Sequence, residues 1–381
     1  MKYRNIGWDD LSVNINLSCF LPEGGVAEYH AIIELNNKYN NAEIQYRDIE
    51  AALERLQQLD ILLGSTLVLK RYFVSDAVNQ SQFLKRKNEN AAVSVVQQPP
   101  LNGTKVSMWA YFVADSRIHT DGYGTTTLSR PHFKHIYNTQ LQKSLKDEYA
   151  ETECIFNTYL ESLYLHGCTL KDNCIRTWIY VQGVDVHYSE MVKARIACFN
   201  REGLNKETHY IASTGIEGRY TNAQTLVLMD AYAIKGISQE QIKYLHASTH
   251  LNPTHEYGVT FERGTTVDYG DRRHIFISGT ASIDNKGEIV HLTNIEKQIE
   301  RTIENIEVLL AEADAVINDI SKMIVYLRDT ADYQIVSDYL DKYYKELPKV
   351  IVWAPVCRPG WLIEIECIAI KEIEANQFEK F

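Results

Sequence analysis

Two glutamates stand two residues apart near the C-terminus, within the apolar stretch Trp361-Leu-Ile-Glu-Ile-Glu-Cys-Ile-Ala-Ile. The alternation predicts a β-strand, on which Glu364 and Glu366 lie on the same face. Two carboxylates on one face of a strand are costly if they are buried without partners. Two interpretations are open. The face is exposed or paired with Lys or Arg side chains, or it lines a cleft in which one acid has a raised pKa and acts as a general acid.

Histidines and cysteines give weaker chemical signals. His246, His250, His255 and Glu256 have spacings that could form a metal site on a helix, but Pro253 would break that helix. The seven cysteines are odd in number and form no C-x-x-C pair, which favours free thiols over a disulfide framework or a zinc site. We therefore expect neither a metal nor a cofactor.

The glutamate strand is the last in a series of predicted elements. His274-Ile-Phe-Ile-Ser-Gly has the pattern of a strand, and apolar residues in 294–313 recur close to helical spacing. A strand at 322–327, a second helix through 339–344 and a strand at 350–353 follow. A similar order can be read twice upstream. The middle copy has predicted elements at 134–137, 149–165, 175–181, 191–199 and 225–234, and the first copy at 29–35, 48–63, 66–74, 93–98 and 104–113.

Three copies of this size predict a triplicated α+β protein rather than a solenoid. We expect antiparallel sheets that carry helices on one face and pack around a pseudo-threefold axis. The predicted units are 1–125, 126–245 and 246–381, with linkers near 116–130 and 236–256.

Alignment of the three closing strands locates the main site. Leu228 and Ser107 fall opposite Glu364, while Asp230 and Trp109 fall opposite Glu366. Because only the third copy carries both carboxylates, we expect the site in 246–381.

Composition excludes several classes of protein. The 381 residues are 45% hydrophobic and include only eight prolines, so the chain is expected to fold throughout. A formal charge of −11 disfavours nucleic acid and anionic membranes as partners. The sequence shows neither a signal peptide nor a long apolar span, from which we expect a cytoplasmic protein.

Three segments resemble one known group of proteins. They are Ile277-Ser-Gly-Thr-Ala-Ser-Ile, the helix that contains Gln298, Thr302 and Asn305, and the closing Ile363-Glu-Ile-Glu-Cys-Ile-Ala. All resemble the reactive-intermediate deaminase (Rid) superfamily, also known as L-PSP endoribonucleases. Rid proteins are homotrimers of a chorismate-mutase-like fold with ligand sites between subunits. The resemblance covers the C-terminal third, and the two upstream repeats look like degenerate copies. It implies a trimer-like body in a single polypeptide, which would be a monomer or a dimer.

Further motifs are similar to those of chorismatases, which are long Rid enzymes. These are Ser278-Gly-Thr-Ala-Ser-Ile, Tyr257-Gly-Val-Thr-Phe-Glu-Arg, Cys357-Arg358 and Ala212-Ser-Thr-Gly-Ile-Glu. Where simple deaminases have an arginine that clamps the substrate carboxylate, this chain has Lys349, which cannot form a bidentate fork. The resemblance therefore favours a chorismatase-like hydrolase or lyase acting on the enolpyruvyl ether of chorismate or a related small cyclic carboxylate. An enamine or imine deaminase and a catalytically silent metabolite-binding protein are the alternatives.

Hydrolysis of an enolpyruvyl ether requires a carboxylic acid that stays protonated near pH 7. Glu364 is the candidate acid, because Ile363, Ile365 and Trp361 would desolvate it and raise its pKa. The family position of Glu366 makes it the supporting partner.

The substrate-binding residues are expected around this acid. Arg358 and Arg263 are the candidate clamps for carboxylates. Ser278 is a candidate hydrogen-bond donor, and the Gly279 backbone is expected to approach the ligand closely. Cys357 is interpreted as a wall of the pocket rather than as a nucleophile.

Overall fold

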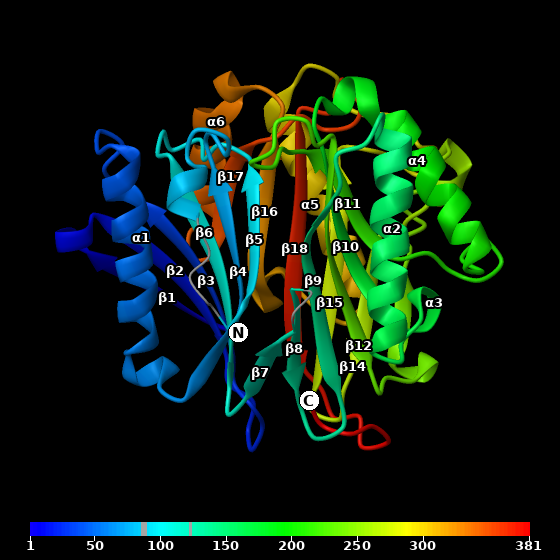
Figure 1. The fold of residues 1–381 in the computed structure, drawn as a ribbon, viewed down its shortest axis with the longest axis horizontal. Helices are drawn as coiled ribbons and strands as arrows, with labels where there is room; N and C mark the ends of the chain where they lie inside the picture. Colours follow the sequence, from blue (N-terminus) through cyan, green and yellow to red (C-terminus); the bar gives the residue numbers. More distant parts are fainter. Residues whose placement is uncertain (85–89, 122–123) are drawn as a thin grey trace.

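Three six-stranded sheets, with helices on their outer sides, make up the computed structural model (Figure 1), which describes residues 1–84, 90–121 and 124–381. The first sheet contains β1 (Lys2–Trp8), β2 (Val13–Phe20), β3 (Glu28–Leu35), β4 (Ser65–Val74), β5 (Ala92–Gln97) and β6 (Val106–Ala114). The second contains β7 (Arg117–Thr120), β8 (Thr125–Ser129), β9 (Lys134–Gln142), β10 (Cys174–Val181), β11 (Ala212–Glu217) and β12 (Val227–Lys235). The third contains β13 (Ile242–Leu245), β14 (Gly264–Asp268), β15 (Arg272–Ala281), β16 (Ile320–Leu327), β17 (Lys349–Trp353) and β18 (Ile363–Glu372).

The strand order is the same in all three sheets. It is β1-β2-β3-β6-β4-β5 in the first sheet, and the corresponding strands follow the same order in the other two. The α+β class and the three repeated units are thus confirmed. The sheets are mixed rather than fully antiparallel, because β4 and β5, β10 and β11, and β16 and β17 are parallel pairs. In the second and third sheets a crossover helix returns the chain in the same direction between these two strands.

The helices cover the outer faces. The described α-helices are α1 (Ala42–Gln57), α2 (Glu148–Leu165), α3 (Leu170–Asn173), α4 (Val184–Arg201), α5 (Ile295–Glu312) and α6 (Tyr333–Tyr343). α5 forms where it was expected, because its Ile residues recur at helical spacing on the buried face and the Asn294 side chain caps the helix by accepting from Lys297 N. No described helix is long and apolar enough to cross a membrane.

Both predicted linkers contain strands. Residues 116–130 hold β7 and β8, which form the edge of the second sheet, and residues 236–256 hold β13, the edge of the third. The Gly, Thr and His content of 116–130 suggested a loop, but the β-branched Thr residues of β8 pair with residues of β9. The chain therefore passes from the first sheet to the second between Ala114 and Arg117, and from the second to the third between Lys235 and Ile242.

The alignment of the closing strands is confirmed by the strand register. Glu364, Leu228 and Ser107 are each the second residue of their strand. Their partners on the neighbouring strand also correspond, with Glu364 opposite Tyr326, Leu228 opposite Tyr180, and Ser107 opposite Phe73.

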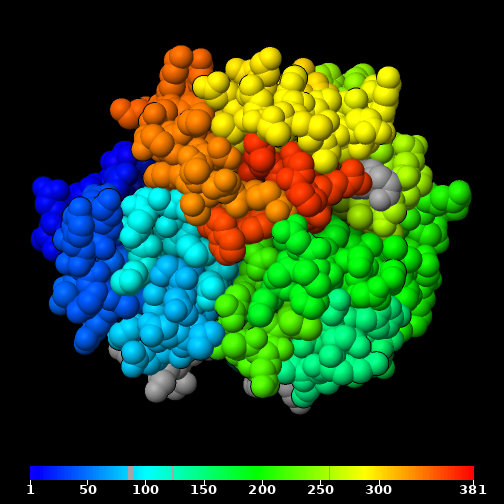
Figure 2. All heavy atoms as spheres, turned by 90° about the horizontal axis from the view of Figure 1, so that it is seen from above, coloured from blue at the N-terminus to red at the C-terminus, as the bar shows by residue number. Residues whose placement is uncertain are grey.

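The three sheets share a hydrophobic core. One cluster joins buried side chains of all three, such as Trp109 of β6, Trp178 of β10 and Ile365 of β18. Two other clusters fill the space between the first sheet and α1 and between the second sheet and its helices α2 and α4. Figure 2 shows the N-terminal, middle and C-terminal parts of the chain meeting near the centre of one face. Because the sheets bury their inner faces against one another, the edges of neighbouring sheets come together, and clefts form along these seams.

Candidate active site

A cleft of about 380 Å³ lies where the second sheet meets the third. We call it the Glu364 cleft. Its second-sheet wall comes from α4 and β11 and includes Tyr188, Arg195, Ser213, Thr214 and Gly215. Its third-sheet wall includes Arg263, Gly279, Cys357, Arg358, Trp361 and Glu364. Backbone bridges from Ala212 to Glu262 and from Ile216 to Val356 hold the two walls together.

Glu364 lies at the start of β18 with only 6% of its surface exposed. Burial raises the pKa of its carboxyl to about 8, and the negative charge of Glu366 adds to this effect, while Arg176 and Arg263 oppose it. A carboxyl group with this pKa is mostly protonated at pH 7. Glu364 can therefore act as an acid in the cleft.

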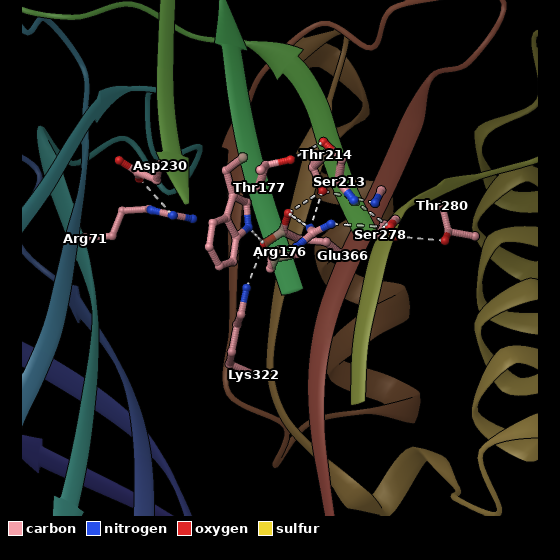
Figure 3. A network of polar contacts seen from close by, with 12 residues as sticks. Arg71, Arg176, Thr177, Ser213, Thr214, Asp230, Ser278, Thr280, Lys322 and Glu366 are labelled. Carbon is pink, nitrogen blue, oxygen red and sulfur yellow. Dashed lines mark hydrogen bonds and ion pairs between the residues drawn. The ribbon is translucent and has the colours of Figure 1, made fainter. Parts of the chain in front are cut away.

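Glu366 has the opposite environment. It is buried, and it accepts hydrogen bonds from Arg176 Nη2 at 2.9 Å, Lys322 Nζ at 2.7 Å, Trp178 Nε1 at 2.8 Å and Thr214 Oγ1 at 2.6 Å (Figure 3). Burial alone would raise the pKa of Glu366, but the charges of Lys322 and Arg176 outweigh burial and hold it well below its ordinary value. The two glutamates thus have pKa values pushed apart, one protonated and one ionised.

A corresponding ion pair lies between the first and second sheets. Asp230, at the place of Glu366 in the second sheet, pairs with Arg71 Nη2 at 3.0 Å (Figure 3). The place of Glu364 beside it is held by the apolar Leu228, so this seam has an Asp–Arg pair but no counterpart of Glu364.

Gly279 allows Glu364 to take its position. A shift of register between Ile277 and Thr280 places Ser278 and Gly279 in a β-bulge of β15, next to β18. A Cβ atom at Gly279 would overlap Oε1 of Glu364, and the Gly279 amide donates to Thr214 Oγ1 at 3.0 Å. The close approach predicted for this glycine is therefore made by the Glu364 carboxyl group.

Ser278 lies behind the cleft rather than in it. Its hydroxyl group is fully buried, donates to Glu262 O at 2.5 Å and accepts from Ser213 N at 2.9 Å. Arg176 Nη1 also donates to it, at 3.3 Å. The serine therefore joins the second sheet to the third, and the ligand contact expected of it is not part of this geometry.

Arg263 and Arg358 both line the cleft, as expected. Arg263 is 5% exposed, and its guanidinium group donates to Asn252 O at 3.0 Å and to Asn252 Oδ1 at 3.1 Å. Arg358 is half-buried over the Trp361 ring, 4.9 Å from its centroid, and donates to Gly287 O at 3.4 Å. Each side chain is thus anchored in the wall of the cleft that holds Glu364.

Cys357 is part of the same wall. Burial raises the pKa of its thiol to about 12, and the nearby Glu364 adds to this effect. A thiol with this pKa is protonated and a poor nucleophile at neutral pH. This environment agrees with a wall residue. All seven cysteines have free thiols.

A family model for endoribonuclease L-PSP matches residues 266–371. A RutC family protein of Pyrococcus abyssi is 41% identical to this chain over 101 residues, which are 26% of this chain and 79% of that protein. This chain belongs to the Rid (RutC) superfamily. The 3-aminoacrylate deaminase RutC of Acinetobacter baylyi is 28% identical over 97 residues, covering 25% of this chain and 77% of that enzyme. A chorismatase crystal structure has the same overall fold, with a TM-score of 0.64 and 17% identity over 80% of this chain and 93% of that chain.

Two side chains of this Rid chain line the cleft although the sequence did not single them out. Arg195 and Tyr188 come from α4 in the second repeat. Arg195 is buried, on the same face of the helix as Met191 and Cys198. A basic residue within an apolar helical stripe is unusual, and this signal is visible in the sequence.

Lys349, at the Rid arginine position, faces a different cleft. It pairs with Met323 in the third sheet, as Ser213 pairs with Thr177 in the second. Each of the two clefts combines a strand of the β17 type from one repeat (β11 or β17) with a strand of the β15 type from another (β15 or β3). Ser213, not Lys349, therefore lies at this strand position in the Glu364 cleft. From the sequence, Lys349 was compared with the arginine that clamps the substrate in Rid deaminases, but Lys349 lines a cleft other than the Glu364 cleft. The absence of an arginine at this position still holds, because Ser213 is uncharged.

The histidines near residue 250 are separate from this cleft. His250 Nε2 lies 3.2 Å from Glu304, and His246 Nδ1 lies 3.7 Å from Glu262. In the described part of the Rid chain, no three His, Cys, Asp or Glu side chains are grouped as metal ligands.

Proposed function

We propose that this chain hydrolyses the enolpyruvyl ether of chorismate or a related small cyclic carboxylate, with Glu364 as the general acid. The observation that carries the proposal is a buried carboxyl group with a pKa of about 8 in a cleft lined by three arginines, Arg195, Arg263 and Arg358. The cleft volume of about 380 Å³ is in the range of small-molecule sites. The likeness to a chorismatase supports the fold, and the chemistry of the cleft supports the reaction.

The reaction needs one proton and one water molecule. The Glu364 carboxyl group donates its proton to the terminal methylene carbon of the enolpyruvyl group, which forms an oxocarbenium ion. Water adds to the cationic carbon, and the resulting hemiketal collapses to pyruvate and the ring alcohol. A proton released from the water restores the acid on Glu364.

The charges around the acid suit an oxocarbenium intermediate. Ionised Glu366 lies two residues along the strand, and its charge is balanced by Arg176 and Lys322. Glu364 becomes a carboxylate after it donates the proton, and this negative charge stabilises the developing cation. The guanidinium groups of Arg263 and Arg358 are proposed to pair with the substrate carboxylates.

A second candidate is an enamine or imine deaminase. The similarity to a 3-aminoacrylate deaminase favours it. Ser213 in place of an arginine clamp opposes it, because a hydroxyl group gives neither charge nor bidentate pairing. A catalytically silent protein that binds a metabolite is the third candidate.

The same experiment separates these three candidates. The protein is incubated with chorismate and, separately, with 2-iminopropionate generated in situ, and pyruvate and ammonia are followed. Pyruvate from chorismate that depends on Glu364 supports the proposal. Ammonia release from the imine without turnover of chorismate supports the deaminase. Activity on neither substrate supports the binding protein.

We also propose that the three units, which meet between Ala114 and Arg117 and between Lys235 and Ile242, form a pseudo-trimer that completes its sites within one chain. Light scattering is then expected to give a monomer or a dimer. An obligate trimer of chains would contradict this part of the proposal.

A further inference from the structure

A second cleft, of about 470 Å³, lies between the first sheet and the third. We call it the Glu34 cleft. One wall is formed by Glu34 of β3 with Asn5, Asn14, Asn16 and Asn102, and the other by α6 and β17. It shares no lining residue with the Glu364 cleft, so a ligand here would not occupy the proposed active site.

The strand register gathers the polar side chains of the first wall. Asn5 of β1 is directly opposite Asn16 of β2, and Asn14 of β2 is directly opposite Glu34 of β3. Asn14 and Asn16 are two residues apart on one strand and share a face. Four polar side chains therefore form a continuous patch on this corner of the sheet.

Hydrogen bonds orient two of the amides. Asn5 Nδ2 donates to Asn16 Oδ1 at 2.9 Å, so the amide NH₂ of Asn16 is the end that can donate to a ligand. Asn102 Oδ1 accepts from Thr104 N at 3.0 Å and from Thr104 Oγ1 at 2.7 Å, and its NH₂ group donates to Glu34 Oε1 at 3.5 Å and to Leu35 O at 3.4 Å, so this amide holds Glu34 in place. The wall thus offers an oriented donor, the Asn16 amide, next to the Glu34 carboxyl group.

The charges of the Glu34 cleft favour an uncharged ligand. Glu34 and Asp341 are matched in number by Lys345 and Lys349. The Lys349 ammonium group contacts Asp341 Oδ1 at 3.0 Å and donates to Tyr344 O at 3.3 Å and Lys345 O at 3.4 Å, which engages its three N–H groups. This lysine is therefore committed within its own repeat rather than available to an anionic ligand.

Glu34 can serve a neutral ligand in either protonation state. Burial raises the pKa of its carboxyl to about 7, with Lys349 opposing and Asp341 adding to the shift. The group then accepts hydrogen bonds as a carboxylate or donates one as an acid. Hydroxyl groups, which both donate and accept, match such a wall.

We propose that the Glu34 cleft binds a neutral polyhydroxylated molecule, either a monosaccharide or a cyclitol. Its hydroxyl groups pair with the amides of Asn14 and Asn16 and with Glu34, while Ser337 and Tyr333 of α6 contact it from the opposite wall. This function is independent of the reaction at Glu364.

The test is titration calorimetry of the full chain with D-glucose, D-galactose and myo-inositol, and with L-glutamine and inorganic phosphate as charged comparators. Saturable binding of at least one of the three polyols is expected, and Asn14→Leu and Asn16→Leu should each weaken it at least ~10-fold. Ser337→Ala is the variant from the opposite wall, and it should weaken binding even if either asparagine variant fails to fold.

Glu364→Gln is the matched control, because it alters only the other cleft and should bind the same polyol as tightly as the wild type. Circular dichroism and the Tm verify that each variant is folded. The proposal is overturned if none of the three polyols binds at ~50 mM, a concentration far above typical metabolite affinities. It is equally overturned if folded Asn14→Leu, Asn16→Leu and Ser337→Ala proteins bind as the wild type does, or if glutamine or phosphate binds in preference.

Discussion

Replacement of Glu364 by glutamine removes one transferable proton while it keeps the shape and the hydrogen-bonding capacity of the side chain. With a pKa of about 8, the carboxyl group is roughly nine-tenths protonated at pH 7, whereas with the ordinary value of 4.5 it would be only about 0.3% protonated. The buried site thus increases the acid form roughly 300-fold at neutral pH. Loss of this acid should lower kcat by ~10²–10⁴-fold and leave KM within about threefold.

Pyruvate release from chorismate, coupled to lactate dehydrogenase and NADH, measures this effect. In the wild type, the alkaline side of the pH profile of kcat/KM should be level up to about pH 8 and fall about tenfold per pH unit above it, because Glu364 must carry its proton.

The same carboxyl group affects the stability of the fold. Its folded pKa exceeds its unfolded pKa, so its stabilising contribution is present at low pH and is lost as the pH rises from about 4.5 through about 8. Glu364→Gln should lack this loss.

Two results would refute the assignment of the acid. One is a folded Glu364→Gln protein that keeps wild-type turnover. The other is a Glu364→Gln protein with residual activity whose kcat/KM still falls above about pH 8 as in the wild type, since this fall would then report the titration of another group.

Other substitutions test the neighbours of this acid. Gly279→Ala should displace the Glu364 carboxyl group and lower kcat at least ~10-fold with little change in Tm, and an unchanged kcat would contradict the close packing at the bulge. Arg358→Lys should raise KM for chorismate at least ~10-fold, because an ammonium group cannot pair bidentately; an unchanged KM would exclude the clamp. Glu366→Gln leaves Lys322 and Arg176 without their counter-charge and should destabilise the fold by ~3–5 kcal/mol in urea titrations; wild-type stability would contradict the ion network.

Local patterns predicted the longer helices and most inner strands of this fold, but they predicted neither the first two strands of any sheet nor β11. The closing strand and α5 could be found because their apolar residues repeat at the spacing of a strand and of a helix. The strands at 117–120 and 125–129 were missed, because edge strands with few apolar residues have a weak pattern and are specified by pairing with β9.

The chemistry of the site depended more on tertiary structure. Glu364 and Arg263 could be located from motifs within the third repeat, but Arg195 and Tyr188 come from the second, and sequence order does not show which repeats are neighbours at a seam. Lys349 illustrates the same limit, since its own repeat directs it to the Glu34 cleft. Ser278 could not be placed because the direction of a side chain in a bulge depends on the local register.

Both walls of the Glu364 cleft belong to one polypeptide, since α4 and β11 are joined to β15 and β18 by peptide bonds. In an assembly of separate subunits, a site of this kind disappears as the protein is diluted and the subunits dissociate. Here the local concentration of one wall at the other is fixed by the chain itself, so the cleft persists at any protein concentration. Because the repeats are separate segments of one chain, the clefts between them can also be lined by different residues. Equivalent strand positions carry Ser213 at one cleft and Lys349 at another, a difference that identical subunits encoded by a single repeat could not have.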